Sequence, residues 1–195
     1  MIDQVLTAIV GFLNTHIGTM APDVVLGNLS LTESPQDEGT NINDSVVVSV
    51  VNIQQESTLR NLPANRQIMD VNGLPRGVAR HPPLLLNVFV LIGANKRQYD
   101  VGLQRVSQVL SFFQANPIFT EAEIPGLPAM GLEKIIFDLH STSFEELNQL
   151  WSIMGGKYIP SVIYKMRMAY IDSIEEDMEV PLVKSIEATF KNKTK

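Results

Sequence analysis

Apolar residues recur at three- and four-residue spacing in three stretches of the chain, which predicts three amphipathic helices. The first covers residues 2–17 and ends at Gly18, and the second covers residues 98–115 before Asn116-Pro117. The third begins after Ser143, which forms a capping-box pattern with Glu146, and ends at Gly155-Gly156. The expected buried stripes are Ile2, Val5, Leu6, Ile9, Phe12, Leu13 and Ile17; Tyr99, Leu103, Val106, Val109, Leu110, Phe112 and Phe113; and Phe144, Leu147, Leu150, Trp151 and Met154.

Short apolar runs and period-two alternation predict strands at residues 24–26, 46–56, 84–92, 132–140 and 162–171. In the 46–56 run, Val46, Val48 and Val50 point one way and Val47, Val51 and Ile53 the other, so both faces should be covered. The 84–92 run is interrupted only by Asn87 and should be central in the sheet. Helices and strands do not strictly alternate, which predicts an α+β fold: a mixed, largely antiparallel sheet flanked by about three helices.

Three segments lack these patterns. Residues 28–44 are rich in polar and turn-forming residues and are predicted to form an exposed loop. Residues 61–83 hold several prolines and glycines without clear periodicity, and this length is typical of a functional or protruding arm. An acidic stretch at 172–179 precedes apolar residues 180–190, where Pro181 suits an edge strand or extended arm. We therefore expect a domain over 1–172 and an acidic linker with an extended tail over 173–195.

The C-terminal apolar segment is expected to pack on a sheet edge or groove, in the same subunit, a neighbouring subunit or another protein. The alternative is that it forms a final strand of its own domain's sheet. Its candidate contact residues are Val180, Leu182, Val183, Ile186 and Phe190.

Charge is unevenly distributed in a chain with a formal net charge of −6. Residues 28–45 are acidic and residues 60–81 are basic, so the two segments could pair between subunits; the alternative is that both are solvated surface, where charges contribute little. The candidate interface residues are Glu33, Asp37 and Glu38 on the acidic side and Arg60, Arg66, Arg76 and Arg80 on the basic side. The net charge, and the absence of a basic stretch interleaved with aromatic residues, disfavour nucleic-acid binding.

Candidate chemistry is sparse. The chain has no cysteine, which excludes disulfides, cysteine-ligated metals and a thiol nucleophile. Nucleotide-binding and metalloprotease motifs are absent, and three histidines leave little material for a metal site. Asp138 and His140 lie close together in sequence, but triad members normally come from separated positions. We expect no catalytic residue, metal or cofactor; His140 should be a solvent-side strand residue, and Trp151, Met166 and Met168 should be core.

No secretory signal is recognisable after Met1, and no apolar run approaches the roughly 20 residues needed to span a bilayer. We expect a soluble protein without a membrane partner.

Several linked segments resemble one family in the expected order over roughly residues 1–172. They are Val24–Asn28, Val51–Glu56 with Thr58–Asn61, Leu86–Asn95 continuing to Tyr99, Ser111–Thr120, and Ser143–Trp151 ending in Gly155–Val162. Together they resemble the tail-terminator, or cap, proteins of antifeeding-prophage-like extracellular contractile injection systems, which are phage-tail-like particles.

The resemblance implies a homohexameric ring at the end of the inner tube distal to the baseplate, in contact with the tube protein and the last layer of sheath protein. Such a ring would stop polymerisation and tie sheath to tube, with no cofactor or catalytic residue. It also implies cytoplasmic assembly followed by release as part of the injection particle. If the sheath is joined by strand addition, the tail or an edge strand could pair with a sheath arm. The alternative function is a general bacterial scaffold or adaptor with an α+β binding domain; an enzyme ranks third.

Overall fold

The computed structural model describes residues 1–18, 22–31, 42–56, 65–69, 75–79, 85–155, 157–170 and 178–180. The chain divides into two compact units. Unit 1 comprises Met1–Ser57 and Leu84–Ile171, and unit 2 comprises Thr58–Pro83 and Asp172–Lys195. Each unit is thus assembled from two separate stretches of sequence.

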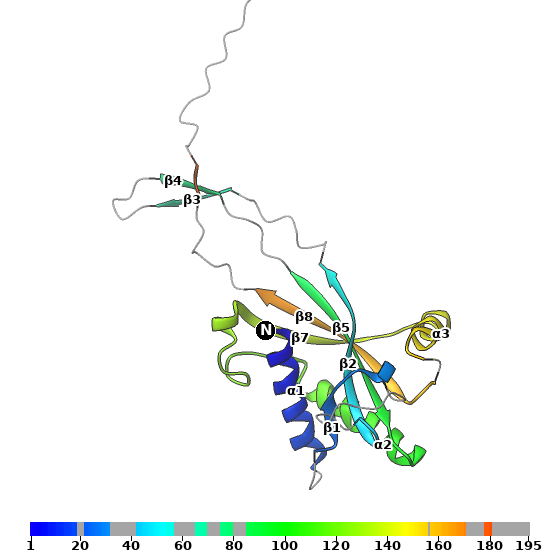
Figure 1. Cartoon of the computed structure of the whole chain (residues 1–195). Helices are drawn as coiled ribbons and strands as arrows, with labels where there is room; N and C mark the ends of the chain where they lie inside the picture. Colours follow the sequence, from blue (N-terminus) through cyan, green and yellow to red (C-terminus); the bar gives the residue numbers. More distant parts are fainter. Residues whose placement is uncertain are drawn as a thin grey trace, which may run out of the picture. The chain divides into compact units, whose positions relative to one another are not determined.

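Unit 1 is built on a mixed six-stranded sheet (Figure 1). Four of its five strand pairings are antiparallel, and only the pairing of β1 (Val24–Leu26) with β2 (Ser45–Gln55) is parallel. The predicted α+β class, the largely antiparallel sheet and the interior position of β5 are therefore confirmed. In spatial order the strands are β1 (Val24–Leu26), β2 (Ser45–Gln55), β5 (Leu86–Asn95), β8 (Ser161–Tyr170), β7 (Leu132–His140) and β6 (Ile118–Phe119).

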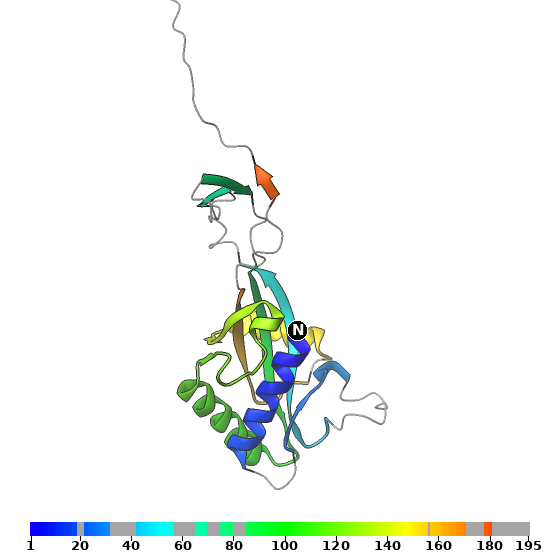
Figure 2. The same cartoon turned by 90° about the vertical axis from the view of Figure 1, so that its left-hand side faces the viewer.

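Three α-helices cover the two faces of this sheet. Helices α1 (Ile2–Ile17) and α2 (Tyr99–Ala115) lie on one face, and α3 (Phe144–Ile153) lies on the other (Figures 1 and 2). The bounds of all the predicted helices and strands of this unit agree with the structure within three residues. The sequence patterns did not indicate the two-residue strand β6 or the short 3₁₀ helices η1 (Leu29–Leu31) and η2 (Pro128–Met130).

Each face of the sheet supplies a separate hydrophobic cluster, because successive side chains of a strand point to opposite faces. On the face of α1 and α2, Val48 pairs with Ile92, and both are buried. On the face of α3, Val47 and Leu91 are fully buried in a cluster with Trp151, which is 6% exposed. The predicted core position of Trp151 and the two-sided burial of the first half of β2 are confirmed.

Strand β8 carries the predicted core methionines. Met166 and Met168 are at most 2% exposed. Between them and the helices lies a cluster of aromatic rings, in which the ring centroids of Phe113 and Tyr164 are 4.4 Å apart and those of Phe113 and Phe137 are 4.6 Å apart. Burial raises the pKa of the Tyr164 hydroxyl above its ordinary value, because the charged form is disfavoured in this apolar core.

The second half of β2 differs from the prediction. A bulge at Val51 puts two residues of β2 opposite one residue of β5, between the pairs Val50–Val90 and Asn52–Phe89. Beyond the bulge, Ile53 pairs with Val88 and so lies on the face of α1 and α2, opposite to the face predicted from simple alternation. Ile53 is 50% exposed, and the predicted two-sided covering was wrong from Val50 onward.

The predicted stripes of α2 and α3 were wrong in part. The buried positions of α2 are Gly102, Val109, Phe112 and Phe113, whereas Tyr99 and Leu103 are 63% and 46% exposed. On α3, Phe144 is 92% exposed. The predicted loop at 28–44 was also wrong at its ends, because Leu29 and Ile42 are buried against the α3 face of the sheet.

Unit 2 contains a three-stranded antiparallel sheet in the order β3-β4-β9. Strands β3 (Asn65–Met69) and β4 (Pro75–Ala79) lie in the 61–83 segment, where the sequence shows no clear periodicity and did not indicate them. Strand β9 (Met178–Val180) begins inside the predicted acidic linker and pairs with β4. Both alternatives for the C-terminal apolar segment concern residues 180–190, of which all but Val180 lie outside the described residues.

A buried charge cluster connects three elements of unit 1. Asp23, just before β1, binds the ammonium of Lys96, just after β5, and its other carboxylate oxygen lies 2.6 Å from Nε of Arg105 on α2. The side chains of all three residues are at most 16% exposed. Asp23 Oδ2 and Arg105 Nε are an ion pair without the alignment of a hydrogen bond. Removing one charge would therefore leave its partners buried and uncompensated.

We expect Asp23→Ala to lower the free energy of unfolding by about 3–5 kcal/mol, because two cations lose their buried counter-ion. Asp138→Ala is the matched control, since it breaks a half-exposed pair in which Arg167 Nε donates to Asp138 at 2.7 Å, and it should cost less than about 1 kcal/mol. Urea unfolding monitored by the single tryptophan measures both values. Equal losses for the two variants would contradict the assignment.

Candidate interaction surfaces

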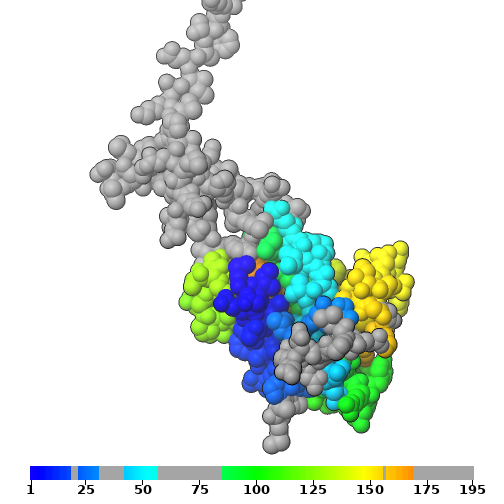
Figure 3. Space-filling view, viewed as in Figure 1, coloured from blue at the N-terminus to red at the C-terminus, as the bar shows by residue number. Residues whose placement is uncertain are grey.

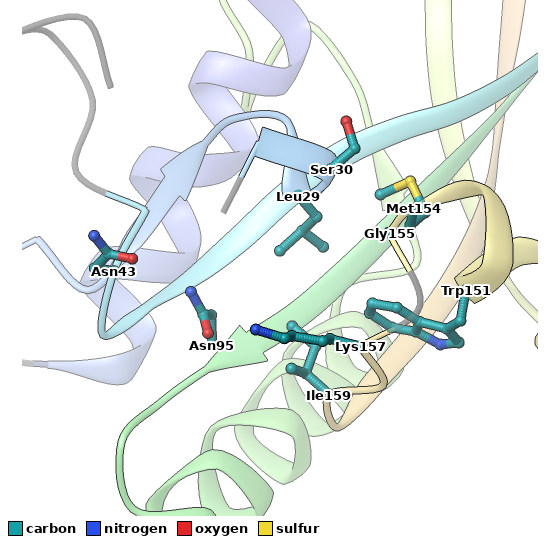
Figure 4. Close-up of a pocket in the computed structure, with 9 residues that line it drawn as sticks. All are labelled: Leu29, Ser30, Asn43, Asn95, Trp151, Met154, Gly155, Lys157 and Ile159. Carbon is teal, nitrogen blue, oxygen red and sulfur yellow. The ribbon is translucent and has the colours of Figure 1, made fainter. Parts of the chain in front are cut away.

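A pocket of about 240 Å³ lies on the α3 side of unit 1 (Figure 4). Its apolar wall includes Trp151 and Ile159, and its polar groups include Asn43, Asn95 and Lys157. Asn95 Nδ2 donates to the carbonyl of Ile42 at 2.9 Å, which fixes the turn before β2 against the end of β5. None of the nine lining residues carries a carboxylate or an imidazole, so this pocket can hold a polar group but has no acid–base pair for catalysis.

The residues with most catalytic potential in the sequence do not form a site. The Asp138 carboxylate is bound to Arg167, and the exposed imidazole of His140 packs edge-on against Phe89, with 5.0 Å between ring centroids. The predicted solvent-side position of His140 is confirmed. His16 is also exposed and packs against Phe112, while His81 lies outside the described residues. Among the described residues, no group of three or more His, Asp or Glu side chains could hold a metal ion.

The outer edge of β2 is the most extended open surface of the sheet. Strand β1 pairs only with Val46–Val48, so from Val50 to Gln55 this edge has no partner strand among the residues that the structure describes. The side chains of Asn52, Ile53, Gln54 and Gln55 are exposed. Unpaired backbone N–H and C=O groups along an edge can accept an added strand from another chain.

The opposite edge of the sheet is also short of partners. Strand β6 pairs only with Ile135 and Ile136, and Phe137 N donates to the carbonyl of Pro117 at 2.8 Å. In the described part of the chain, the end of β7 therefore has no neighbouring strand on its outer side, and Leu139 is 56% exposed there. Both edges of the six-stranded sheet offer backbone groups for strand pairing.

The candidate interface residues predicted from the sequence fall mostly outside the described residues. Three are placed, all in the sheet of unit 2: Arg66 pairs with Val78, Arg76 with Ile68, and Val180 with Gly77. The structure thus brings the basic arm and the start of the C-terminal segment into one sheet. The others lie outside the described residues: Arg60, Arg80, Glu33, Asp37, Glu38, Leu182, Val183, Ile186 and Phe190.

Sequence reasoning missed the two open edges of unit 1. A signal was present in β2, because the valine-rich run changes at Asn52 to a polar run that contains Gln54 and Gln55. A strand buried on both faces does not carry consecutive polar residues. This change therefore marks the point where the faces of β2 are no longer covered, and the open edge of β2 lies in the same stretch. The shortness of β1 and β6 cannot be recognised without knowing which strands they join.

Helix α3 begins with the predicted capping box. The Ser143 hydroxyl accepts from the backbone N–H of Glu146 at 3.2 Å, and the Glu146 carboxylate accepts from the backbone N–H of Ser143 at 2.8 Å. The hydrogen bond from the Ser143 N–H is the main cause that lowers the pKa of Glu146 from its ordinary value of 4.5. The cap fixes the start of the helix whose far end borders the pocket.

The sequence matches the family described as the Pvc16 N-terminal domain over residues 4–185. A search of curated proteins found no match. None of the helices in the described ranges is long and apolar enough to cross a membrane.

Two solved cryo-EM structures are similar in fold. The first is the PVC sheath/tube terminator of an extracellular contractile injection system in its extended state, with 17% identity, a TM-score of 0.57, and coverage of 100% of this chain and 64% of that chain. The second is the tube-terminating cap of the anti-feeding prophage, with 18% identity, a TM-score of 0.56, and coverage of 97% and 61%. The chain therefore spans less than two thirds of the length of either solved chain. The resemblance to tail-terminator caps that the sequence motifs indicated is confirmed.

We expect Glu146→Ala to lower the melting temperature at pH 7, because the Ser143 N–H loses its acceptor. The Glu146 carboxyl has a lowered pKa in the folded protein, so its stabilisation is complete above the unfolded value of 4.5 and is lost as pH falls through the folded value. The difference in melting temperature from wild type should shrink below about pH 4.5. Glu145→Ala, in the same helical turn, is the control; the same pH profile for both variants would contradict the role of the cap.

Proposed function

The chain belongs to the Pvc16 N-terminal domain family, and on this premise we propose that it is a structural cap of a contractile injection particle. In this proposal it binds the baseplate-distal end of the inner tube as a ring of six copies and ends the growth of tube and sheath. The observation that carries the proposal is the family match over residues 4–185, joined by a fold similar to those of two terminator caps.

The physical mechanism is a mismatch between two faces. A tube of stacked rings grows because the upper face of each ring accepts another ring. A terminator binds that upper face with its own lower face. Its upper face is different, so no further ring can bind. Closed cyclic symmetry makes each weak contact count several times, because all copies bind together.

The open sheet edges support contact with another polymer. From Val50 to Gln55, β2 offers backbone donors and acceptors that an extended sheath arm could pair with, and the exposed Ile53 gives such an arm an apolar contact.

The charge of unit 2 offers a second contact. We propose that Arg60, Arg66, Arg76 and Arg80 dock on acidic surface of the tube or of a neighbouring subunit, with Glu33, Asp37 and Glu38 as the candidate partners.

The rival function is a scaffold or adaptor that works as a monomer or dimer. Mass separates the two, because six copies of a 21.6 kDa chain form a ring of about 130 kDa. The 240 Å³ pocket beside Trp151 gives no support to an enzyme function, since the residues that line it lack an acid–base pair.

Deleting this protein from its particle should leave tubes or sheaths of irregular length, because nothing then blocks further addition of subunits. Electron microscopy of purified particles measures the length distribution, and expression of the full chain in trans is the control that should restore a narrow distribution. Uniform particles from the deletion strain would refute the cap function.

Truncation after Ser173 removes β9 from the sheet of unit 2 and leaves every strand of the six-stranded sheet intact. We expect the truncated chain to keep the circular-dichroism spectrum of a folded α+β protein but to bind sheath or neighbouring subunits more weakly. Analytical ultracentrifugation and a sheath co-sedimentation assay measure the loss. A truncated chain that assembles and binds like the full chain would rule out a contact role for residues 174–195, and an unfolded product would show that unit 1 depends on them.

A further inference from the structure

Helix α2 carries an apolar seam beside its buried face. Tyr99, Leu103, Val106 and Leu110 recur at spacings of four, three and four residues, so they form one continuous row along the helix. Val106 and Leu110 are partly buried against the core, whereas Tyr99 and Leu103 are 63% and 46% exposed. The row is therefore partly buried at Val106 and Leu110, and at the start of α2 it becomes an exposed apolar ridge. Such spacing is typical of a helix that packs against another element.

A groove of about 940 Å³ runs between the outer face of α1 and the segment 123–130. Its apolar floor and walls include Phe12, Ile124 and Met130. On α1 the groove follows Gln4, Ala8, Gly11 and Thr15, which have the same four-three-four spacing as the ridge of α2. A side chain at Gly11 would meet nothing within 4 Å, so the fold of the subunit gives no reason for a glycine in this helix interior.

The ridge and the groove lie on different parts of unit 1. In Figure 3 the blue surface of α1 and the yellow-green surface that contains residues 123–130 lie at the left, and the green surface of α2 lies at the lower right. The residues that line the groove do not include any from α2, so the ridge does not fill it within one subunit. The exposed ridge residues Tyr99 and Leu103 are large, whereas Ala8 and Gly11 at the middle of the groove are small, so the groove has room for the ridge.

The charges at the two borders are also complementary. The exposed Arg97 precedes the ridge, while the exposed Glu123 lines the groove. The Glu123 carboxylate accepts hydrogen bonds from the hydroxyl and backbone N–H of Thr120, which lower its pKa and keep it charged. Asp100 is the one acidic residue in the first turn of α2, and it lies about 100° around the helix from Tyr99.

We propose that the exposed ridge of α2, formed by Tyr99 and Leu103, inserts into the groove between α1 and residues 123–130 of a second copy of this chain. The contact joins two different surfaces, so one subunit keeps its groove free and the other keeps its ridge free for the next subunit. Repetition of such a head-to-tail contact produces a closed ring when its rotation closes. The inference rests on the proposed ring and names the surfaces that would hold it together.

Engineered cysteines test this contact directly, because the chain contains no cysteine of its own. Gly11→Cys and Leu103→Cys both lie at exposed positions, and in the proposed interface they approach each other only between subunits. Mild oxidation of assembled particles that carry the double variant should give a ladder of covalent oligomers up to six copies on a non-reducing gel. The matched control replaces Leu103→Cys by Gln104→Cys, one position further on the solvent side of α2, and should give at least fivefold less cross-linked product.

Two cross-linking results would overturn the interface. One is monomer alone after oxidation of particles of normal length, which would leave the cap function standing. The other is a covalent dimer from Leu103→Cys without Gly11→Cys, because it would mean that two copies of α2 meet each other.

Leu103→Glu supplies a measurement that does not need particles. The full-length variant should keep its circular-dichroism spectrum and lose the ring in analytical ultracentrifugation, whereas Gln104→Glu should keep both the spectrum and the ring. An intact ring with Leu103→Glu would also overturn the proposal, and particles of irregular length in the wild type would count against the cap function alone.

Discussion

Strand β5 is apolar on both faces, and this property determines the arrangement of unit 1. Leu91 and Ile92 are both buried, yet they point to opposite sides of the sheet. A strand of this kind is stable only when both faces of the sheet are covered. Helices α1 and α2 cover one face, and the small helix α3 with η1 covers the other. The smaller covering leaves a pocket on the α3 side, where Trp151 forms part of the wall.

The helices cover the faces of the sheet but not its edges. Strands β1 and β6 are three and two residues long, so they shield only a small part of β2 and β7. Proteins that remain monomeric usually protect such edges with charge, proline or a covering loop. In unit 1 the described edge of β2 carries uncharged polar residues and Ile53, a composition suited to contact with another chain. The centre of the sheet is thus buried on both faces, whereas the outer parts of β2 and β7 stay open among the described residues.

Much of unit 1 could be predicted from the sequence, because its helices and strands have clear periodicity and conventional end signals. The capping box of Ser143 and Glu146 and the turn at Gly18 follow from local chemistry alone. Packing decided two features that local patterns could not predict. The bulge at Val51 reverses the face on which Ile53 lies, and α2 turns Gly102 inward instead of Leu103. The buried Asp23 was also missed, since its partners Lys96 and Arg105 lie more than seventy residues away. The sheet of unit 2 depends on pairing between segments with weak patterns, which no local signal identifies.

The positions of the three strands of unit 2 along the chain have a consequence for folding during synthesis. Strands β3 and β4 leave the ribosome before β5, but β9, their third partner, follows every strand of the six-stranded sheet. While the chain is being made, unit 1 can complete its sheet at a time when β4 still has an unpaired edge. The three-stranded sheet closes only when the C-terminal region has been translated. A contact that requires this sheet is therefore available only after synthesis has passed Val180, and shorter nascent or prematurely ended chains cannot make it.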